Sequence, residues 1–187
     1  MILKGKTRKG KEFILRPLKL EDSCFLYRWL NDPKVNQNYI NPEDHPKTLE
    51  EKKARIKKLI ASGCITFIIE VKGKPIGFCG SLELGKKTTG FGLTIGEKDY
   101  QGQGYGTAAA KLLIDYGFNE LGLERIESAA MEFNQRSIKM LQRAGLQVTS
   151  REEKARWREV TADGHAESKF WAILHFAITK EEWLKNR

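Results

Sequence analysis

The stretch that constrains this chain most is Gln101-Gly102-Gln103-Gly104-Tyr105-Gly106-Thr107. Its three glycines carry no Cβ atom, so the backbone N–H groups can close around a bulky anion. Apolar residues then recur at the spacing of one helical face, at Tyr105, Ala108, Ala109, Leu112, Leu113 and Tyr116. The stretch is therefore predicted to lie at a helix N-terminus, where unpaired amides and the helix dipole both favour phosphate.

Several motifs compete for this stretch. A P-loop needs Gly-Lys followed by Ser or Thr at the helix start, and Thr107 after Gly106 excludes it. A dinucleotide fingerprint fits residues 104–109, but that motif leaves its strand directly, whereas residues 96–103 intervene here after Ile95. The third motif, Gln-x-x-Gly-x-Gly, fits without these conflicts, and here the stretch closely resembles the pyrophosphate loop of the GNAT N-acyltransferase superfamily. A glycine-rich turn that caps a core helix without any ligand stays open as the structural alternative.

The net charge of +9 favours anionic partners, either nucleic acid or a polyphosphate cofactor. Lysines and arginines are scattered, and no zinc-finger or RNP-like motif is present, so the charge does not name the anion. The 187 residues fit one domain, and no apolar run approaches the roughly 20 residues of a membrane span.

The cysteines predict the compartment and the histidines exclude a metal site. Three cysteines without CxxC spacing are expected to be buried, reduced thiols of a cytoplasmic protein. Three histidines are too dispersed along the chain to form a metal site, and they are His45, His165 and His175.

The order of helix and strand signals predicts one α/β domain with a mixed sheet. Capping signals open helices at Thr48, Asn134 and Thr179. Short connections predict antiparallel strands at 65–71, 76–84 and 91–95. The helix after the glycine loop is a crossover, which predicts parallel pairing of Phe91–Ile95 with Arg125–Met131. Arg151–Lys169 is polar and is expected to form an irregular hairpin loop.

Most of the chain, from Phe13 to Trp183, resembles the GNAT N-acyltransferase superfamily, in the branch of ribosomal-protein alanine N-acetyltransferases and polyamine acetyltransferases. The matching pieces, in chain order, are Arg16-Pro17, Leu20-Glu21-Asp22, Lys74-Pro75-Ile76-Gly77-Phe78, Tyr100 to Thr107, Asn134-x-x-Ser137, Ala144-Gly145-Leu146 and Glu182-Trp183. The ordered set is far more specific than any one piece. The resemblance implies a single GNAT-like domain over residues 1–187, with a mostly antiparallel, twisted sheet, two central parallel strands that splay apart, and flanking helices.

The resemblance also implies an acetyl-CoA-dependent N-acetyltransferase, with acetyl-CoA as co-substrate and no metal. Backbone amides would hold the CoA pyrophosphate at Gln101, Gly102, Gln103, Gly104, Tyr105, Gly106 and Thr107. The pantetheine arm would pair with a strand at Leu93, Thr94 and Ile95, as an added strand does. Asn134 would touch the pantetheine or thioester, would only cap its helix, or would do both.

Two departures from the family pattern affect catalysis. Relatives often carry a Tyr late in the helix after the Asn, where this chain has Leu141. Ser137, one turn earlier, is our candidate donor to the leaving sulfur, the alternative being an ordinary first-turn serine. Relatives also often carry an acidic residue early in the pantetheine strand. Here Glu83 on the adjoining strand is the candidate base or water-positioning carboxylate and Glu132 the second, unless both are surface carboxylates.

The acceptor is expected to be a primary amine, either a protein N-terminus or a small amino compound, acetylated by direct transfer in a ternary complex. Asp32–Thr48 and Arg151–Lys169 should border its cleft, and their mixed charges are less acidic than a polyamine site requires. No membrane contact is expected, a homodimer is compatible, and nucleic acid would be met only through a ribosomal-protein substrate. Two alternatives stay open, a non-catalytic CoA-binding regulator and a nucleic-acid-binding module.

Overall fold

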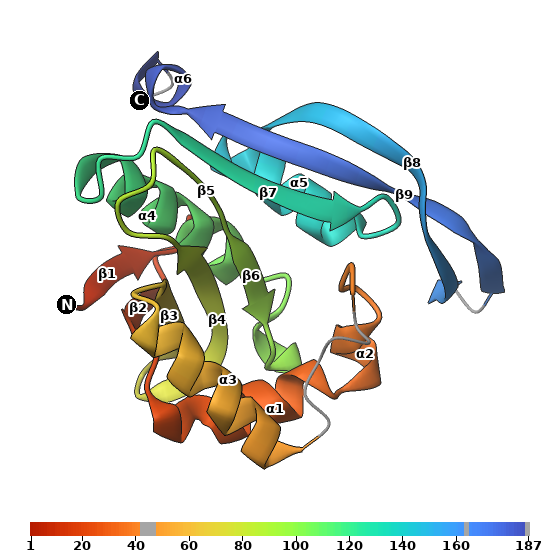
Figure 1. The fold of residues 1–187 in the computed structure, drawn as a ribbon, viewed down its shortest axis with the longest axis horizontal. Helices are drawn as coiled ribbons and strands as arrows, with labels where there is room; N and C mark the ends of the chain where they lie inside the picture. Colours follow the sequence, from red (N-terminus) through yellow and green to blue (C-terminus); the bar gives the residue numbers. More distant parts are fainter. Residues whose placement is uncertain (42–47, 163–164, 186–187) are drawn as a thin grey trace.

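The computed structural model describes residues 1–41, 48–162 and 165–185. Within them, a five-stranded antiparallel sheet follows the order β1 (Leu3–Lys6), β2 (Glu12–Pro17), β3 (Ile65–Val71), β4 (Lys74–Leu82) and β6 (Gly92–Ile95). A four-stranded sheet follows the order β5 (Thr88–Gly90), β7 (Arg125–Met131), β9 (His165–Thr179) and β8 (Gln147–Ala162). Its β5–β7 pair is parallel, and its other pairs are antiparallel. The expected mixed, mostly antiparallel α/β fold is confirmed (Figure 1).

The two sheets meet at Phe91, which joins β5 to β6. Residues 88–90 pair with residues 125–127 in parallel, and the Phe91 amide still donates to the Glu127 carbonyl at 2.9 Å. Beyond this point β6 pairs with β4, whereas β7 continues along β9. The expected pairing of all of 91–95 with 125–131 was therefore wrong, because the chain changes partners at Phe91. Figure 1 shows β6 and β7 diverging from there, so the implied splay is present.

Helices cover both faces of the five-stranded sheet. On one face, α1 (Ser23–Leu30) and α3 (Leu49–Ala61) pack through Trp29 and Ile56 against Ile68. Successive side chains of a strand point to opposite faces of the sheet, so Phe67, next to Ile68, lies on the other face. There it packs edge-on against Tyr116 of α4 (Tyr105–Asn119). The helix α5 (Gln135–Ala144) joins α4 on that side, and the short elements are η1 (Leu20–Asp22), α2 (Pro33–Asn36), η3 (Lys98–Tyr100) and α6 (Lys180–Lys185).

Two motifs of the resemblance turn out to anchor elements. The Arg16 guanidinium donates to both carboxylate oxygens of Asp22, at 2.7 and 2.8 Å, and to Glu70 at 2.7 Å. Because Asp22 is buried at the start of α1, this bidentate pair fixes where that helix leaves the sheet. At the other end of the chain, the Trp183 indole donates to Asp115 at 2.7 Å and docks α6 on α4.

The predicted helix caps are confirmed, whereas two other expectations from the sequence were wrong. The Thr48 and Thr179 capping boxes both form. The irregular loop expected at Arg151–Lys169 was wrong, since residues 151–162 belong to β8 and residues 165–169 to β9, and the two strands pair. Cys79 is buried, but Cys24 is exposed and Cys64 is half-buried, so the expectation of three buried thiols was wrong for these two. Among the described helices, none is long and apolar enough to cross a membrane.

Candidate functional site

The glycine loop presents a run of unbonded amides. Gly102 and Gly104 have φ values of 71° and 90°, in the left-handed region that favours glycine. The Ala108 amide donates to the Gly104 carbonyl at 3.0 Å, which closes the first helical turn of α4. Across the described part of the chain, the amides of residues 102–107 donate no backbone hydrogen bond. A Cβ atom at Gly102 would meet nothing within 4 Å, so the loop borders open space at this residue.

Gln101 supports the loop from its side chain. Its backbone amide already donates to the Lys98 carbonyl at 3.0 Å. Its side-chain amide donates to the Ile95 carbonyl at 2.9 Å and accepts from Arg136 of α5 at 3.1 Å. Gln101 therefore braces the loop between β6 and α5, and the open amides begin at Gly102.

The register of β6 decides which backbone groups face the gap between β6 and β7. The Gly96 amide donates to Ile76 of β4 at 2.9 Å, and successive residues direct their backbone groups to opposite edges. The backbone of Thr94 accordingly faces β4. The backbone groups of Leu93 and the amide of Ile95 face the gap, where an added strand could bind them, whereas the Ile95 carbonyl already accepts from Gln101.

The N-terminus of α5 carries two polar side chains beside the loop. The Asn134 Oδ1 atom accepts from the Ser137 amide at 3.1 Å, so the predicted N-cap is confirmed. In the described chain, neither the Asn134 Nδ2 group nor the Ser137 hydroxyl has a hydrogen-bond partner. Both can therefore bind a ligand. Leu141 is 1% exposed in the core and offers no polar group.

The two carboxylate candidates differ in position, since Glu83 lies at the paired end of β5, whereas Glu132 directly precedes the N-terminus of α5. Glu83 is exposed, and its amide donates to Thr89 at 3.2 Å, where β5 is still paired with β7. Leu82 pairs with Ile65, so Glu83 lies beside the start of β3, where burial together with its charge raises the pKa of Cys64. Glu132 accepts from the Ala172 amide at 2.9 Å and pairs with Arg151 at 2.8 Å, so both of its oxygens are engaged.

Sequence reasoning did not single out Tyr39, which the structure brings to the pantetheine strand. Its hydroxyl shares a hydrogen bond with the Thr94 hydroxyl. Burial raises the pKa of Tyr39 to about 12 against the opposing effect of Thr94, so the phenol stays protonated at neutral pH. The residue comes from the polar stretch 32–48, where no periodic pattern marked it. In the same stretch, 42–47 lie outside the described residues.

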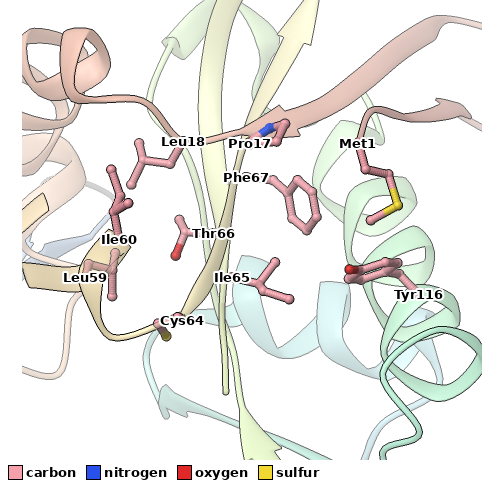
Figure 2. Close-up of a pocket in the computed structure, with 11 residues that line it drawn as sticks. Met1, Pro17, Leu18, Leu59, Ile60, Cys64, Ile65, Thr66, Phe67 and Tyr116 are labelled. Atoms are coloured by element: carbon pink, nitrogen blue, oxygen red, sulfur yellow. The ribbon is translucent and has the colours of Figure 1, made fainter. Parts of the chain in front are cut away.

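A cavity of about 320 Å³ lies at the other end of α4. Figure 2 shows Leu59 and Ile60 on one side of it and Tyr116 and Met1 on the other. Tyr116 follows the helix start by eleven residues, or roughly 16 Å along the axis. The cavity is therefore separate from the glycine loop.

The chemistry of the loop suits a diphosphate. Consecutive amides at the N-terminus of a long helix supply donors and a favourable dipole to an anion. Diverging strands alongside leave backbone groups for an extended arm. Among the described residues, no three His, Cys, Asp or Glu side chains gather as metal ligands do. The fold and the loop together define a class of proteins that bind a nucleotide-linked cofactor with an extended arm.

The comparisons identify the family. The profile of the acetyltransferase (GNAT) domain matches residues 12–147, and the chain belongs to this family. It is thus an N-acetyltransferase that takes its acyl group from acetyl-CoA.

Among its relatives is an uncharacterized N-acetyltransferase, p20, of Bacillus licheniformis. The two are 31% identical over 144 residues, which cover 72% of this chain and 79% of p20. The fold is similar to spermidine N-acetyltransferase from Vibrio cholerae in complex with CoA and spermine, with a TM-score of 0.76, 16% identity, and coverage of 92% of this chain and 98% of that one. It is also similar to the ribosomal L7/L12 α-N-protein acetyltransferase RimL in complex with CoA, with a TM-score of 0.72, 15% identity, and coverage of 89% and 93%.

Proposed function

We propose that residues 1–187 act as one domain that transfers an acetyl group from acetyl-CoA directly to a primary amine in a ternary complex. The observation that supports this most is the run of unbonded amides at 102–107, which opens α4 beside two diverging strands. The acceptor is a protein N-terminus or a small amino compound, since relatives of this fold act on both kinds of amine.

Each part of the site has one task in this proposal. The amides from Gly102 to Thr107 hold the pyrophosphate, and Gln101 keeps the loop in place. The gap-facing backbone groups of Leu93 and the amide of Ile95 bind the pantetheine arm as an edge strand binds a peptide. Asn134 donates from Nδ2 to the same arm while its Oδ1 atom caps α5.

The transfer forms one C–N bond and breaks one C–S bond. The neutral amine attacks the thioester carbon, the carbonyl oxygen becomes an oxyanion, and a gap-facing amide of β6 stabilises it. The Ser137 hydroxyl donates to the sulfur as it leaves as a thiolate. The amine proton passes to water. Because Glu83 lies at the paired end of β5, it can receive this proton only by way of solvent. Holding both substrates in register supplies several kcal/mol of the barrier reduction.

Titration calorimetry with acetyl-CoA, followed by detection of free thiol with candidate amines, tests the proposal. The amines are spermidine, an aminoglycoside and a peptide with a free N-terminus. We expect binding of acetyl-CoA and release of thiol with at least one amine. Binding without thiol release from any amine would contradict catalysis, and absence of binding would contradict the site.

Gly104→Asp tests the loop itself. A carboxylate at this position would enter the phosphate site, so we expect acetyl-CoA affinity to fall by about a hundredfold or more while the fold is retained. Gly85→Asp is the matched control because Gly85 has a similar φ, 74°, and a Cβ there meets nothing within 4 Å. Equal affinities in the two variants would exclude the loop as the pyrophosphate site.

The location and assembly of the protein belong to the same proposal. We place it in the cytoplasm, because Cys24, Cys64 and Cys79 are all free thiols. Homodimer formation is a further part of it, which light scattering at several concentrations would test.

A further inference from the structure

The residues Tyr39, Ile40 and Asn41, which we call the clamp segment, reach both of the diverging strands. Tyr39 shares its hydrogen bond with Thr94 of β6. The next side chain, Ile40, packs against the apolar cluster of Met131, Trp171 and Ile173 on β7 and β9. One short piece of chain therefore touches β6 on one side of the gap and β7 on the other.

One bond holds the clamp segment at Asn41, and a second holds the chain that leads into it at Asp32. Asn41 accepts a hydrogen bond from Arg156 of β8 at 3.0 Å. On the other side, Asp32 caps α2 and pairs with Lys98 at 2.6 Å, next to the glycine loop. The segment that contains Tyr39 is thus fastened to both sheets and to the connection that leads into the loop.

The bond to Thr94 acts on the strand that needs support. The strand β6 is the edge of its sheet, with β4 on one side and the gap on the other. An edge strand is held on one side only, so a contact to its side chain restricts its movement. The backbone of Thr94 faces β4, and its side chain is what the clamp segment holds. Leu93 and Ile95, on either side, carry the gap-facing groups.

We propose that Tyr39 is a positioning residue for acetyl transfer, acting through Thr94 to fix β6 at the distance from β7 that the thioester requires. The proposal rests on the proposed function, in which β6 binds the pantetheine arm. Tyr39 itself does not take the amine proton. Its effect is to keep the gap-facing amides of Leu93 and Ile95 aligned with the carbonyl that they bind, which matters because misplacement of about 1 Å can cost two orders of magnitude in rate.

The test compares Tyr39→Phe, Thr94→Val and the double variant with the wild type. We expect each single change to lower kcat about five- to tenfold, as loss of one aligned hydrogen bond does, and the double change to lower it no further. Affinity for acetyl-CoA should stay within about threefold, because loss of this contact loosens β6 without pushing it into the gap and leaves the pyrophosphate loop untouched. Thr94→Ser keeps the hydroxyl and should therefore retain the wild-type kcat, unlike Thr94→Val. Tyr116→Phe is the matched control, a buried tyrosine on α4 away from the loop.

Hydrogen–deuterium exchange of residues 92–95 supplies a reading that does not need turnover. Tyr39→Phe and Thr94→Val should both speed exchange in this segment severalfold, and Tyr116→Phe should not. Wild-type exchange and wild-type kcat in both variants, or losses that add in the double variant, would overturn the proposal. If the wild-type protein did not bind acetyl-CoA, the proposed function would fail, and exchange would still decide whether Tyr39 holds β6.

Discussion

The N-terminus of α5 brings together an asparagine that caps the helix and a serine whose hydroxyl is unbonded. The amide of Ser137 serves the cap, whereas its side chain is half-buried and open to a ligand. The structural and the catalytic interpretation of this serine thus concern different atoms. A substitution that removes only the hydroxyl can separate them.

For Ser137→Ala we expect thiol release to slow about tenfold, the effect of one hydrogen bond to a charged group, with CoA affinity within about twofold. The helix cap should survive, because the backbone amide that bonds to Asn134 is unchanged. Single-turnover kinetics measures the first quantity and calorimetry the second. Ser62→Ala, at the end of α3, is the control. A wild-type rate in Ser137→Ala would remove the serine from the reaction.

Lys52 is a buried ammonium group on α3, with an exposed fraction of 9%. Burial first, and then the charge of Arg55, lower its pKa from 10.5 to about 8. At pH values between about 8 and 10.5, Lys52 is protonated in the unfolded chain but not in the native protein. The free energy of unfolding should therefore rise with pH from about 8 to about 10.5, and the full penalty should be present below pH 8.

Replacing Lys52 by Met should remove this penalty. We expect the free energy of unfolding at pH 7 to increase by up to about 3 kcal/mol and its rise between pH 8 and 9.5 to disappear. Urea denaturation at several pH values measures both. The exposed Lys57, replaced in the same way, is the control. An unchanged pH dependence in Lys52→Met would show that another group titrates.

At the scale of elements, the sequence predicted what neighbours along the chain decide. Thr48, Asn134 and Gly145 mark helix ends because a cap is built within about four residues of its partner. Strand pairing depends on residues far apart. The charged stretch 151–169 has no alternating pattern, yet residues 151–162 and 165–169 lie in the paired strands β8 and β9. The change of partners at Phe91 has no local signal either, which is why the parallel register was misjudged.

In the candidate site, too, the sequence predicted contiguous motifs but not contacts between distant residues. The glycine loop and the cap at Asn134 could be predicted, since both are contiguous motifs. Tyr39 could not, because its partner Thr94 is 55 positions away and lies on another element. Glu83 was chosen from the order of strands, and the structure places it where β5 and β7 are still paired.

Gly77 shows how tightly β4 and β6 pack. A Cβ atom at this position would lie 2.1 Å from the Thr94 carbonyl oxygen and 3.0 Å from the Ile95 Cα, both backbone atoms. Because neither atom can turn aside, Gly77→Ala should push β6 towards the gap. We expect a loss of about 1–3 kcal/mol in stability, as overpacking gives, and at least tenfold weaker acetyl-CoA binding.

Thermal denaturation and calorimetry measure the two effects of Gly77→Ala. Gly90→Ala on β5 is the control, since a Cβ there would meet only the Glu127 carbonyl oxygen, at an ordinary 3.8 Å. Normal acetyl-CoA affinity in a destabilised Gly77→Ala would mean that the place of β6 does not govern binding.

At the scale of the whole molecule, the charge of +9 acts together with the loop. The scattered cations attract an anionic ligand over distances that salt screens, about 10 Å at 0.1 M and about 3 Å at 1 M. The amides at 102–107 act only at contact, where screening is weak. Salt should therefore slow the arrival of acetyl-CoA far more than it speeds its departure.

Stopped-flow measurements should find that the association rate constant of acetyl-CoA falls about tenfold between 20 mM and 500 mM NaCl, with the dissociation rate constant within about threefold. Acetyl-pantetheine, which lacks the phosphates, is the control ligand and should show no such dependence. A dissociation rate that carried most of the salt effect would mean that screened side-chain charges hold the pyrophosphate. Salt disturbs contacts at the N-terminus of α4 least, so a salt-dependent dissociation rate would mean that the backbone amides of the loop contribute little to binding.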